Sequence, residues 1–181
     1  MFLLVGVVVA VALAIGLFTG IGTGGGGGKP VAGGQVPTFS LPRLGGGGTV
    51  GVAGDGGGNG TPAILVFFAS WCEPCQAEIP MIAATHRQQV AAHSPLAKVA
   101  IIGVDGSDPT ANAQAFVRRS GVTFPVGADR NYTVTQGKFY FTGLPAVVYV
   151  NGNGVIAALH EGPIESRAQL VAWQSRLLHG G

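Results

Sequence analysis

Two cysteines, Cys72 and Cys75, are the only ones in this chain of 181 residues, and Glu73 and Pro74 separate them. Residues 63–69 form a continuous apolar run that predicts a buried strand, and a helical pattern follows the cysteines. The pair therefore lies where a strand ends and a helix begins. The unpaired N–H groups and partial positive charge at a helix start favour a thiolate on Cys72. Cys75, one turn into the helix, is placed to attack a mixed disulfide on Cys72, which is the chemistry of thiol–disulfide exchange.

Other uses of a Cys-x-x-Cys pair fit this sequence less well. A zinc site needs further ligands, and the four histidines have no ligand-like spacing: His86, His93, His160 and His179. Covalent haem attachment needs a histidine directly after the second cysteine, where this chain has Gln76. We therefore expect no metal and no cofactor, only a redox-active Cys72–Cys75 disulfide. A purely structural disulfide stays open as an alternative.

The two residues between the cysteines are expected to tune the redox couple. Pro74 suits the first turn of a helix and fixes its conformation. The carboxylate of Glu73 repels a thiolate on Cys72, so we expect it to raise the pKa of the Cys72 thiol and to disfavour the reduced thiolate form. The alternative is that Glu73 is a solvated residue at the helix start.

The rest of the chain predicts the elements that must hold this turn in place. Apolar runs predict strands at 36–44, 49–53, 63–69, 98–104, 145–151 and 155–160, and helical signals predict helices at 75–90, 109–119 and from 166 onward. Asp108 is expected to cap the 109–119 helix, and Asn151-Gly-Asn-Gly predicts a hairpin turn. This order predicts an α/β domain in which helices flank a central mixed β-sheet.

The composition limits the class of protein and its organisation. The formal net charge is +2 and no basic stripe is present, so a nucleic-acid-binding protein is not expected. Glycine accounts for 32 residues and is concentrated in two tracts. We interpret residues 23–35 as a flexible glycine-rich tether and residues 45–60 as a glycine-rich loop within a domain at 36–181.

The N-terminal residues 1–22 are interpreted as a transmembrane anchor. Residues 2–21 carry no charged side chain, and as a helix at about 1.5 Å per residue they would span about 30 Å, the thickness of the bilayer hydrocarbon. A signal peptide usually has a basic start, and no Lys or Arg precedes Lys29. A signal peptide stays open as the alternative.

Around the cysteines the sequence resembles the thioredoxin superfamily. Phe-Phe-Ala-Ser-Trp-Cys-Glu-Pro-Cys at 67–75 resembles its strand-to-helix active-site signature, and Pro80 resembles its helix proline. Gly143-Leu144-Pro145 resembles the loop whose cis-proline faces the sulfurs. With the Val-Pro-x-Phe-x-Leu leader, Phe-Pro-Val at 124–126 and the hairpin at 150–154, residues 36–174 look most like membrane-tethered, extracytoplasmic thiol–disulfide oxidoreductases of the TlpA and ResA type.

This resemblance implies a thioredoxin-like fold and roles for further residues. Trp71, Leu144 and Pro145 are expected to form a substrate groove, with a cis peptide bond before Pro145; the alternative for Trp71 is a core residue. Thioredoxins carry a buried acid six residues before the first cysteine, where this chain has Val66. Asp105 lies near the position where proteins of this type can carry an acidic helper, which would tune the couple; a loop-capping role is the other interpretation and the one that we favour from the sequence.

The resemblance also implies a function. It predicts a single-pass protein of the cell membrane whose extracytoplasmic domain exchanges disulfides with partner proteins. We expect a reductant in cytochrome c maturation or a similar pathway, with apocytochrome c as one partner and a membrane protein as electron donor. A disulfide oxidase or isomerase, or a copper-delivery protein of the same fold, is the alternative. A thiol peroxidase is not expected, because its Pro-x-x-x-Thr-x-x-Cys motif would need Thr at the position of Ala69.

Overall fold

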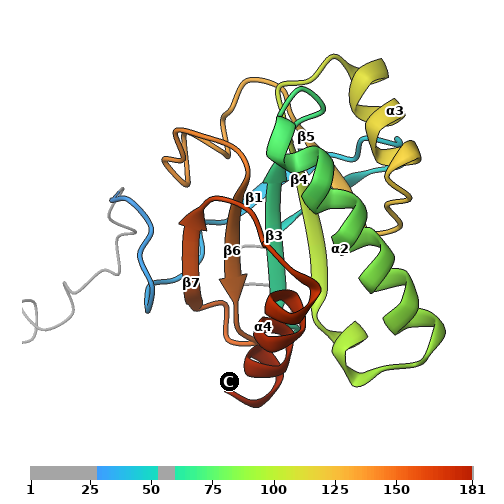
Figure 1. Ribbon diagram of the computed structural model, residues 1–181. Helices are drawn as coiled ribbons and strands as arrows, with labels where there is room; N and C mark the ends of the chain where they lie inside the picture. The colour runs from blue at the N-terminus through green and yellow to red at the C-terminus, as the bar shows by residue number, and fades with distance from the viewer. Residues whose placement is uncertain (1–27, 53–59, 181) are drawn as a thin grey trace, which may run out of the picture.

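The computed structural model describes residues 28–52 and 60–180 (Figure 1). In chain order their elements are β1 (Phe39–Pro42), β2 (Thr49–Val52), β3 (Ala63–Phe68), α2 (Glu73–Ala91), the 3-10 helix η1 (Pro95–Lys98), β4 (Ala100–Gly106), α3 (Thr110–Arg119), β5 (Val126–Asp129), β6 (Ala146–Val150), β7 (Ile156–Glu161) and α4 (Arg167–His179).

A five-stranded mixed sheet forms the centre of the domain, with the strand order β5-β4-β3-β6-β7. Strand β4 runs parallel to both β3 and β5, whereas β6 runs antiparallel to both β3 and β7. Parallel pairing therefore comes first along the chain and an antiparallel hairpin comes last. The predicted α/β fold class, a central mixed sheet flanked by helices, is confirmed.

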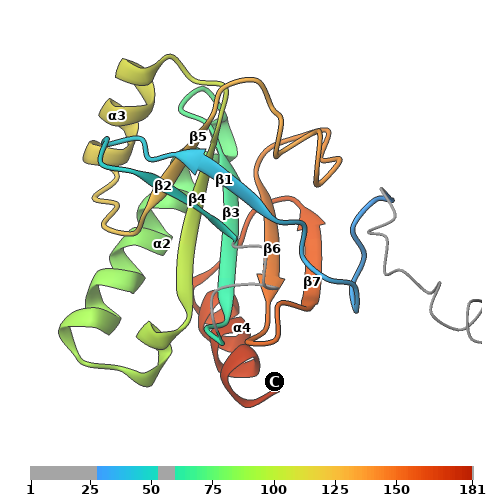
Figure 2. The ribbon, with the colours of Figure 1, turned by 180° about the vertical axis from the view of Figure 1, so that it is seen from behind.

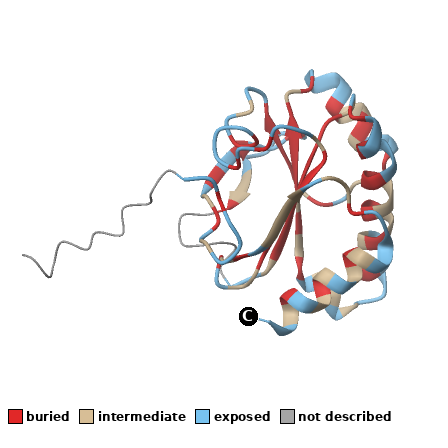
Figure 3. Cartoon of the chain, turned by 60° about the vertical axis from the view of Figure 1, so that its left-hand side comes forward, coloured by how far each residue is buried: buried red, intermediate tan, exposed pale blue. Residues whose placement is uncertain are grey.

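The sheet is covered differently on its two faces. Helices α2 and α4 lie on one face (Figure 1), and the β1–β2 hairpin lies across the other (Figure 2). Strand β3 serves both layers because its six residues are all buried. Ile64, Val66 and Phe68 pack in the cluster that contains helix residues, while Leu65 and Phe67 pack in the cluster that contains hairpin residues. Figure 3 shows the buried residues gathered along the central strands. The continuous apolar run in the sequence thus reflects a strand enclosed on both faces.

The predicted hairpin turn at Asn151 and the predicted start of the last helix near residue 166 are confirmed. The Asn151 side-chain Oδ1 accepts hydrogen bonds from the N–H groups of Asn153 and Val155, each at 3.0 Å, and so stabilises the turn between β6 and β7. The hydroxyl of Ser166 accepts the Gln169 N–H at 3.2 Å, which makes Ser166 the N-cap of α4. Both signals are local in sequence, which is why the sequence predicts them well.

The start of α3 differs from the expectation. The N-cap residue is Pro109, and no side chain caps this helix. The predicted cap, Asp108, is wrong, because its carboxylate instead accepts two hydrogen bonds from Ser70. No strand is predicted at β5, whose four residues include Gly127 and Asp129 and form no apolar run.

The end of the predicted tether belongs to the folded domain. The N–H of Gly33 donates to the Ile156 carbonyl at 2.8 Å, and the N–H of Ile156 donates to the Gly34 carbonyl at 2.9 Å. Gln35 forms a β-bridge with Val155. Residues 33–35, expected in the flexible tether, are therefore paired with the start of β7.

The predicted membrane anchor cannot be placed. Within residues 28–52 and 60–180, no helix has the combination of length and apolar character that is needed to cross a bilayer. Residues 1–22, residues 23–27 of the predicted tether and residues 53–59 of the glycine-rich loop lie outside the described residues.

Candidate active site

The two cysteines lie at the junction of β3 and α2 and form a disulfide, with their Cα atoms 5.3 Å apart. Cys72 is the N-cap residue of α2, and its sulfur accepts the backbone N–H of Cys75 at 3.3 Å. The exposed fraction is 4% for Cys72 and 0% for Cys75. A sulfur at the N-cap receives the unpaired N–H groups of the helix, and this interaction would stabilise a thiolate after reduction.

The residues next to the disulfide face solvent. Trp71 is 59% exposed, so the alternative of a core tryptophan is wrong. Glu73 and Pro74 are both exposed in the first turn of α2. The side-chain amide of Gln76 donates to the Ser70 carbonyl at 3.1 Å and closes the turn from the helix side. The cysteines are therefore reached from an exposed rim formed by Trp71, Glu73 and Pro74.

A loop between β5 and β6 lies on the other side of this rim. The Leu144–Pro145 bond is cis, as expected. Trp71 and Leu144 line one cavity of about 240 Å³, together with residues of the 132–143 segment that include Tyr132 and Phe141. Pro145 is buried and does not line this cavity, and its carbonyl accepts the Gly162 N–H at 2.7 Å. Of the three expected groove residues, the structure thus brings Trp71 and Leu144 to one cavity, and Pro145 is not among the residues that line it.

Asp105 lies inside β4, where it is the register partner of Phe68, so the favoured loop-capping interpretation is wrong. The side chain is 2% exposed, and its Oδ1 has no hydrogen-bond partner among the described residues. Burial raises the pKa of Asp105 to about 8, with further contributions from a hydrogen bond to Asp108 and from the charge of Asp108. Val66, at the usual position of the thioredoxin acid, lies in the apolar core.

Asp108 connects this buried acid to the active-site turn. Its carboxylate accepts the backbone N–H of Ser70 at 2.5 Å and the Ser70 hydroxyl at 2.8 Å. Arg130 donates to the Asp108 carbonyl at 3.1 Å and also to the Thr110 hydroxyl. Ser70 is two residues before Cys72. A chain of polar contacts therefore runs from Asp105 through Asp108 to the backbone that carries the cysteines.

A second buried acid, Glu78, was missed from the sequence. It lies one turn after Cys75 on α2 and is 3% exposed. Its Oε1 accepts the Ile164 N–H at 2.6 Å, while its Oε2 has no partner among the described residues. Burial raises the pKa of Glu78 to about 7, and the Ile164 hydrogen bond opposes this increase. The signal was available, because Cys75, Glu78, Ile79 and Ile82 have helical spacing and so share one face.

The disulfide at this strand–helix junction and the sheet order around it can be compared with known proteins. The AhpC/TSA family model matches residues 32–159. The chain belongs to the AhpC/TSA family. This match covers both cysteines, both buried acids and the cis-proline loop, and it agrees with the expected thioredoxin-like relationship.

Individual relatives carry more specific names. The chain is 29% identical over 103 residues to the thiol-disulfide oxidoreductase ResA of Halalkalibacterium halodurans, covering 57% of this chain and 55% of that protein. It is 31% identical over 102 residues to a thiol:disulfide interchange protein DsbE homolog of Paracoccus denitrificans, covering 56% of this chain and 51% of that protein. The chain thus spans about half the length of the curated relatives it matches.

A solved structure supports the fold. A putative thiol:disulfide interchange protein DsbE from Chlorobium tepidum superimposes with a TM-score of 0.65 and 23% identity, covering 83% of this chain and 98% of that one. At this identity the similarity concerns the fold alone, which is thioredoxin-like.

Proposed function

We propose that this protein is a thiol–disulfide oxidoreductase that exchanges disulfides with partner proteins through Cys72 and Cys75. One observation carries the proposal: the two cysteines form a disulfide at the N-terminus of α2, with Cys72 as the N-cap and Cys75 fully buried. Cys75 has no exposed surface, whereas Cys72 keeps a small exposed surface next to the exposed residues Trp71 and Glu73, so Cys72 is the attacking sulfur and Cys75 resolves the mixed disulfide.

In the reducing direction the exchange has two steps. The Cys72 thiolate attacks one sulfur of the partner disulfide, forms a bond to it and releases the other partner sulfur as a thiolate. The Cys75 thiol then loses its proton, and the thiolate attacks the Cys72 sulfur, which forms the Cys72–Cys75 disulfide and releases the second partner thiolate. Two electrons pass from the protein to the partner, and the reverse sequence oxidises a partner dithiol.

Cys75 needs a base in this sequence because Val66 cannot accept a proton. The raised pKa values of Glu78, about 7, and Asp105, about 8, lie near that of a thiol and suit proton exchange. Glu78 shares the buried face of α2 with Cys75, and Asp105 connects through Asp108 to the active-site turn. We assign proton transfer to these two acids, with Glu73 and Pro74 tuning the couple from the exposed side.

The cavity between Trp71 and Leu144 is the proposed position of the partner segment around its cysteine. An exposed tryptophan offers a flat apolar surface at the rim of the disulfide.

The cellular setting rests on the sequence. We propose that residues 1–22 anchor the protein in the cell membrane with the catalytic domain outside the cytoplasm. The ResA-like signature and the names of the relatives support a reductant in cytochrome c maturation or a similar pathway, supplied with electrons by a membrane donor. Disulfide oxidation or isomerisation on the same fold is the alternative direction.

The exchange chemistry can be tested with the full chain in detergent. Cys75→Ser should accumulate a mixed disulfide with a peptide disulfide, whereas Cys72→Ser should accumulate none, and both should lose turnover in an insulin-reduction assay. Mass spectrometry of the trapped adduct identifies the attacking sulfur. The assigned order would be contradicted if an adduct formed on Cys75 in the Cys72→Ser variant and none formed on Cys72 in the Cys75→Ser variant.

The direction of electron flow follows from the reduction potential. Equilibration of the full chain with glutathione and with thioredoxin buffers should give a potential nearer the thioredoxin value of about −270 mV for a reductant. A value near about −120 mV would identify an oxidase instead.

A further inference from the structure

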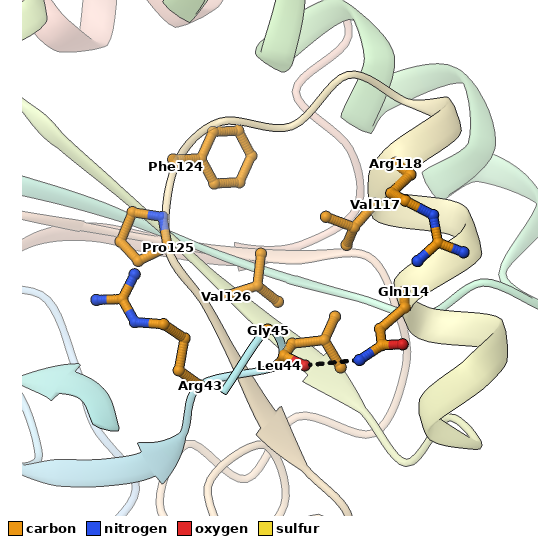
Figure 4. A pocket seen from close by; sticks show the side chains of 9 residues that line it. All are labelled: Arg43, Leu44, Gly45, Gln114, Val117, Arg118, Phe124, Pro125 and Val126. Atoms are coloured by element: carbon orange, nitrogen blue, oxygen red, sulfur yellow. Dashed lines mark hydrogen bonds between the residues drawn. The ribbon is translucent and has the colours of Figure 1, made fainter. Parts of the chain in front are cut away.

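A cavity of about 420 Å³ lies away from the cysteines, beside α3 (Figure 4). Three segments form it: residues 43–45 after β1, one side of α3 with Gln114, Val117 and Arg118, and residues 124–126 at the start of β5. It shares no residue with the cavity at Trp71 and Leu144. Its volume falls within the range of about 300–1,000 Å³ that small-molecule sites occupy.

The walls of this cavity are fixed by hydrogen bonds. The Leu44 N–H donates to the Val126 carbonyl at 2.9 Å, and the Leu44 carbonyl accepts the side-chain amide of Gln114 at 3.1 Å. Leu44 is thus tied to β5 on one side and to α3 on the other. The backbone of Arg43 is also tied to β5, by a β-bridge to Gly127. The backbone around the cavity is therefore preformed, and a ligand would have to order only the exposed side chains, such as those of Arg43 and Arg118.

The lining combines an apolar floor with two cations. Leu44, Phe124 and Val126 are buried apolar residues. The side chains of Arg43 and Arg118 lie on opposite sides of the cavity (Figure 4), and both residues are exposed. No carboxylate belongs to the lining, and neither guanidinium has an ion-pair or hydrogen-bond partner among residues 28–52 and 60–180.

The next arginine on α3, Arg119, contrasts with Arg118 because its guanidinium already has a partner. Arg119 stacks its guanidinium over the Phe116 ring at 4.8 Å and takes no part in the cavity. Arg118, one residue earlier, is directed to the cavity instead (Figure 4). A guanidinium presents a planar fork of N–H donors that matches a carboxylate, and two of them beside an apolar floor select a ligand with both properties.

We propose that this cavity binds a small organic acid in which one carboxylate is attached to an apolar body about the size of an aromatic ring. The ring would cover Phe124 and Val126, and the carboxylate would lie at the rim, where the long exposed side chains of Arg43 and Arg118 can turn toward it from opposite sides. The site is separate from the disulfide and adds a ligand-binding function to the proposed exchange activity.

The test measures binding of 3-phenylpropanoate to the full chain in detergent by isothermal titration calorimetry. The wild type should bind one equivalent in a saturable manner. Arg43→Gln and Arg118→Gln should each weaken binding about 5- to 10-fold, because each removes one charge-assisted contact at a partly exposed site. The matched control Arg119→Gln should bind like the wild type.

Two further compounds test separately whether the ring and the carboxylate of the ligand are needed. Acetate, which lacks the ring, and 3-phenylpropan-1-ol, which lacks the charge, should each bind about 10-fold more weakly or worse. Val117→Phe, which fills the cavity, should abolish binding of 3-phenylpropanoate while insulin reduction is kept.

Three results would overturn the proposal: no saturable binding to the wild type, equal effects of Arg118→Gln and Arg119→Gln, or binding of acetate as tight as that of the aromatic acid. Disulfide exchange is measured on the same samples. A failure of the proposed exchange activity can therefore be distinguished from a failure of the proposed acid-binding site.

Discussion

Asp105 and Glu78 are both buried carboxyls below the active-site turn, but they are held in opposite ways. Asp105 lies among other charged groups: burial raises its pKa first, a hydrogen bond and the charge of Asp108 raise it further, Arg130 lowers it and Asp129 raises it. Glu78 has one backbone hydrogen bond, from Ile164, that opposes the effect of burial. The first pKa depends on neighbouring charges, and the second depends mainly on the apolar surroundings.

This difference determines how each acid can influence the cysteines. Protonation of Asp105 is coupled to Asp108, and Asp108 holds the backbone of Ser70, two residues before Cys72. Glu78 has no such connection and acts from the helix that carries Cys75. Substitution of Asp108 should therefore change the pKa of Asp105 strongly and leave the pKa of Glu78 unchanged.

Removal of Asp108 should have the largest effect. Asp108→Ala deletes two charge-assisted hydrogen bonds and leaves the Ser70 N–H unpaired, which should lower the free energy of unfolding by about 2–4 kcal/mol. It should also lower the pKa of Asp105, because the Asp108 carboxyl helps to raise it. Urea unfolding of the full chain, followed by tryptophan fluorescence, measures the stability.

The control for this change is Ser70→Ala. That variant loses only the hydroxyl bond, so it should cost about 1 kcal/mol and leave the pKa of Asp105 unchanged. Equal costs for Asp108→Ala and Ser70→Ala would show that the backbone bond to Ser70 contributes nothing.

The pH dependence of stability should separate the two acids. Both have a folded pKa above the unfolded value, so their contribution to stability is complete below about pH 4 and is lost as the pH rises through about 7 for Glu78 and about 8 for Asp105. Each should contribute a slope of up to about 1.4 kcal/mol per pH unit in its own window. The oxidised protein is used, since disulfide-bonded cysteines do not titrate.

Variants of the two acids show which acid is responsible for the loss of stability in each pH range. Asp105→Asn should remove the loss of stability between pH 7 and 8, and Glu78→Gln should reduce the slope only below pH 7. The comparison with wild type at each pH cancels other groups, such as His86, whose pKa is lowered by burial. If Glu78→Gln removed the upper window instead, the assignment of the two acids would be reversed.

The sequence predicted the parts of this site that depend on local patterns. The strand before Cys72, the helix after it and the β6–β7 turn follow from apolar runs and short-range hydrogen bonds. Asp108 could not be predicted, because its partner Ser70 is 38 residues away and an Asp before a Pro equally suits a helix cap. Strand β5 has no apolar run and forms because β4 pairs with it and Arg43 bridges to it.

Tyr149 tests whether Glu78 is isolated from other polar side chains. Its hydroxyl is buried without a partner among the described residues, and its ring stacks on Trp173 at 4.2 Å. Burial raises the pKa of Tyr149, and the charge of Glu78 raises it further. Tyr149→Phe removes only the unpaired hydroxyl, so we expect a change within about 1 kcal/mol and an unchanged pH window for Glu78. A window shifted to higher pH would reveal a hydrogen bond, direct or through water, that stabilises the charged carboxylate.

The smallest expected effect belongs to Glu73, which contrasts with both buried acids because it is exposed. Its carboxylate is next to Cys72 in the first turn of α2, so it repels a Cys72 thiolate, but solvent and salt screen this repulsion. Glu73→Gln should therefore lower the pKa of the Cys72 thiol by only about half a unit and make the couple more oxidising by roughly 15 mV. Iodoacetamide alkylation rates against pH give the thiol pKa, and glutathione equilibration gives the potential. Glu165→Gln, which changes an exposed glutamate outside α2, is the matched control. If both variants leave the Cys72 pKa and the potential unchanged, Glu73 is a solvated helix-start residue, and the redox properties of the couple are determined by the helix N-terminus and the buried acids alone.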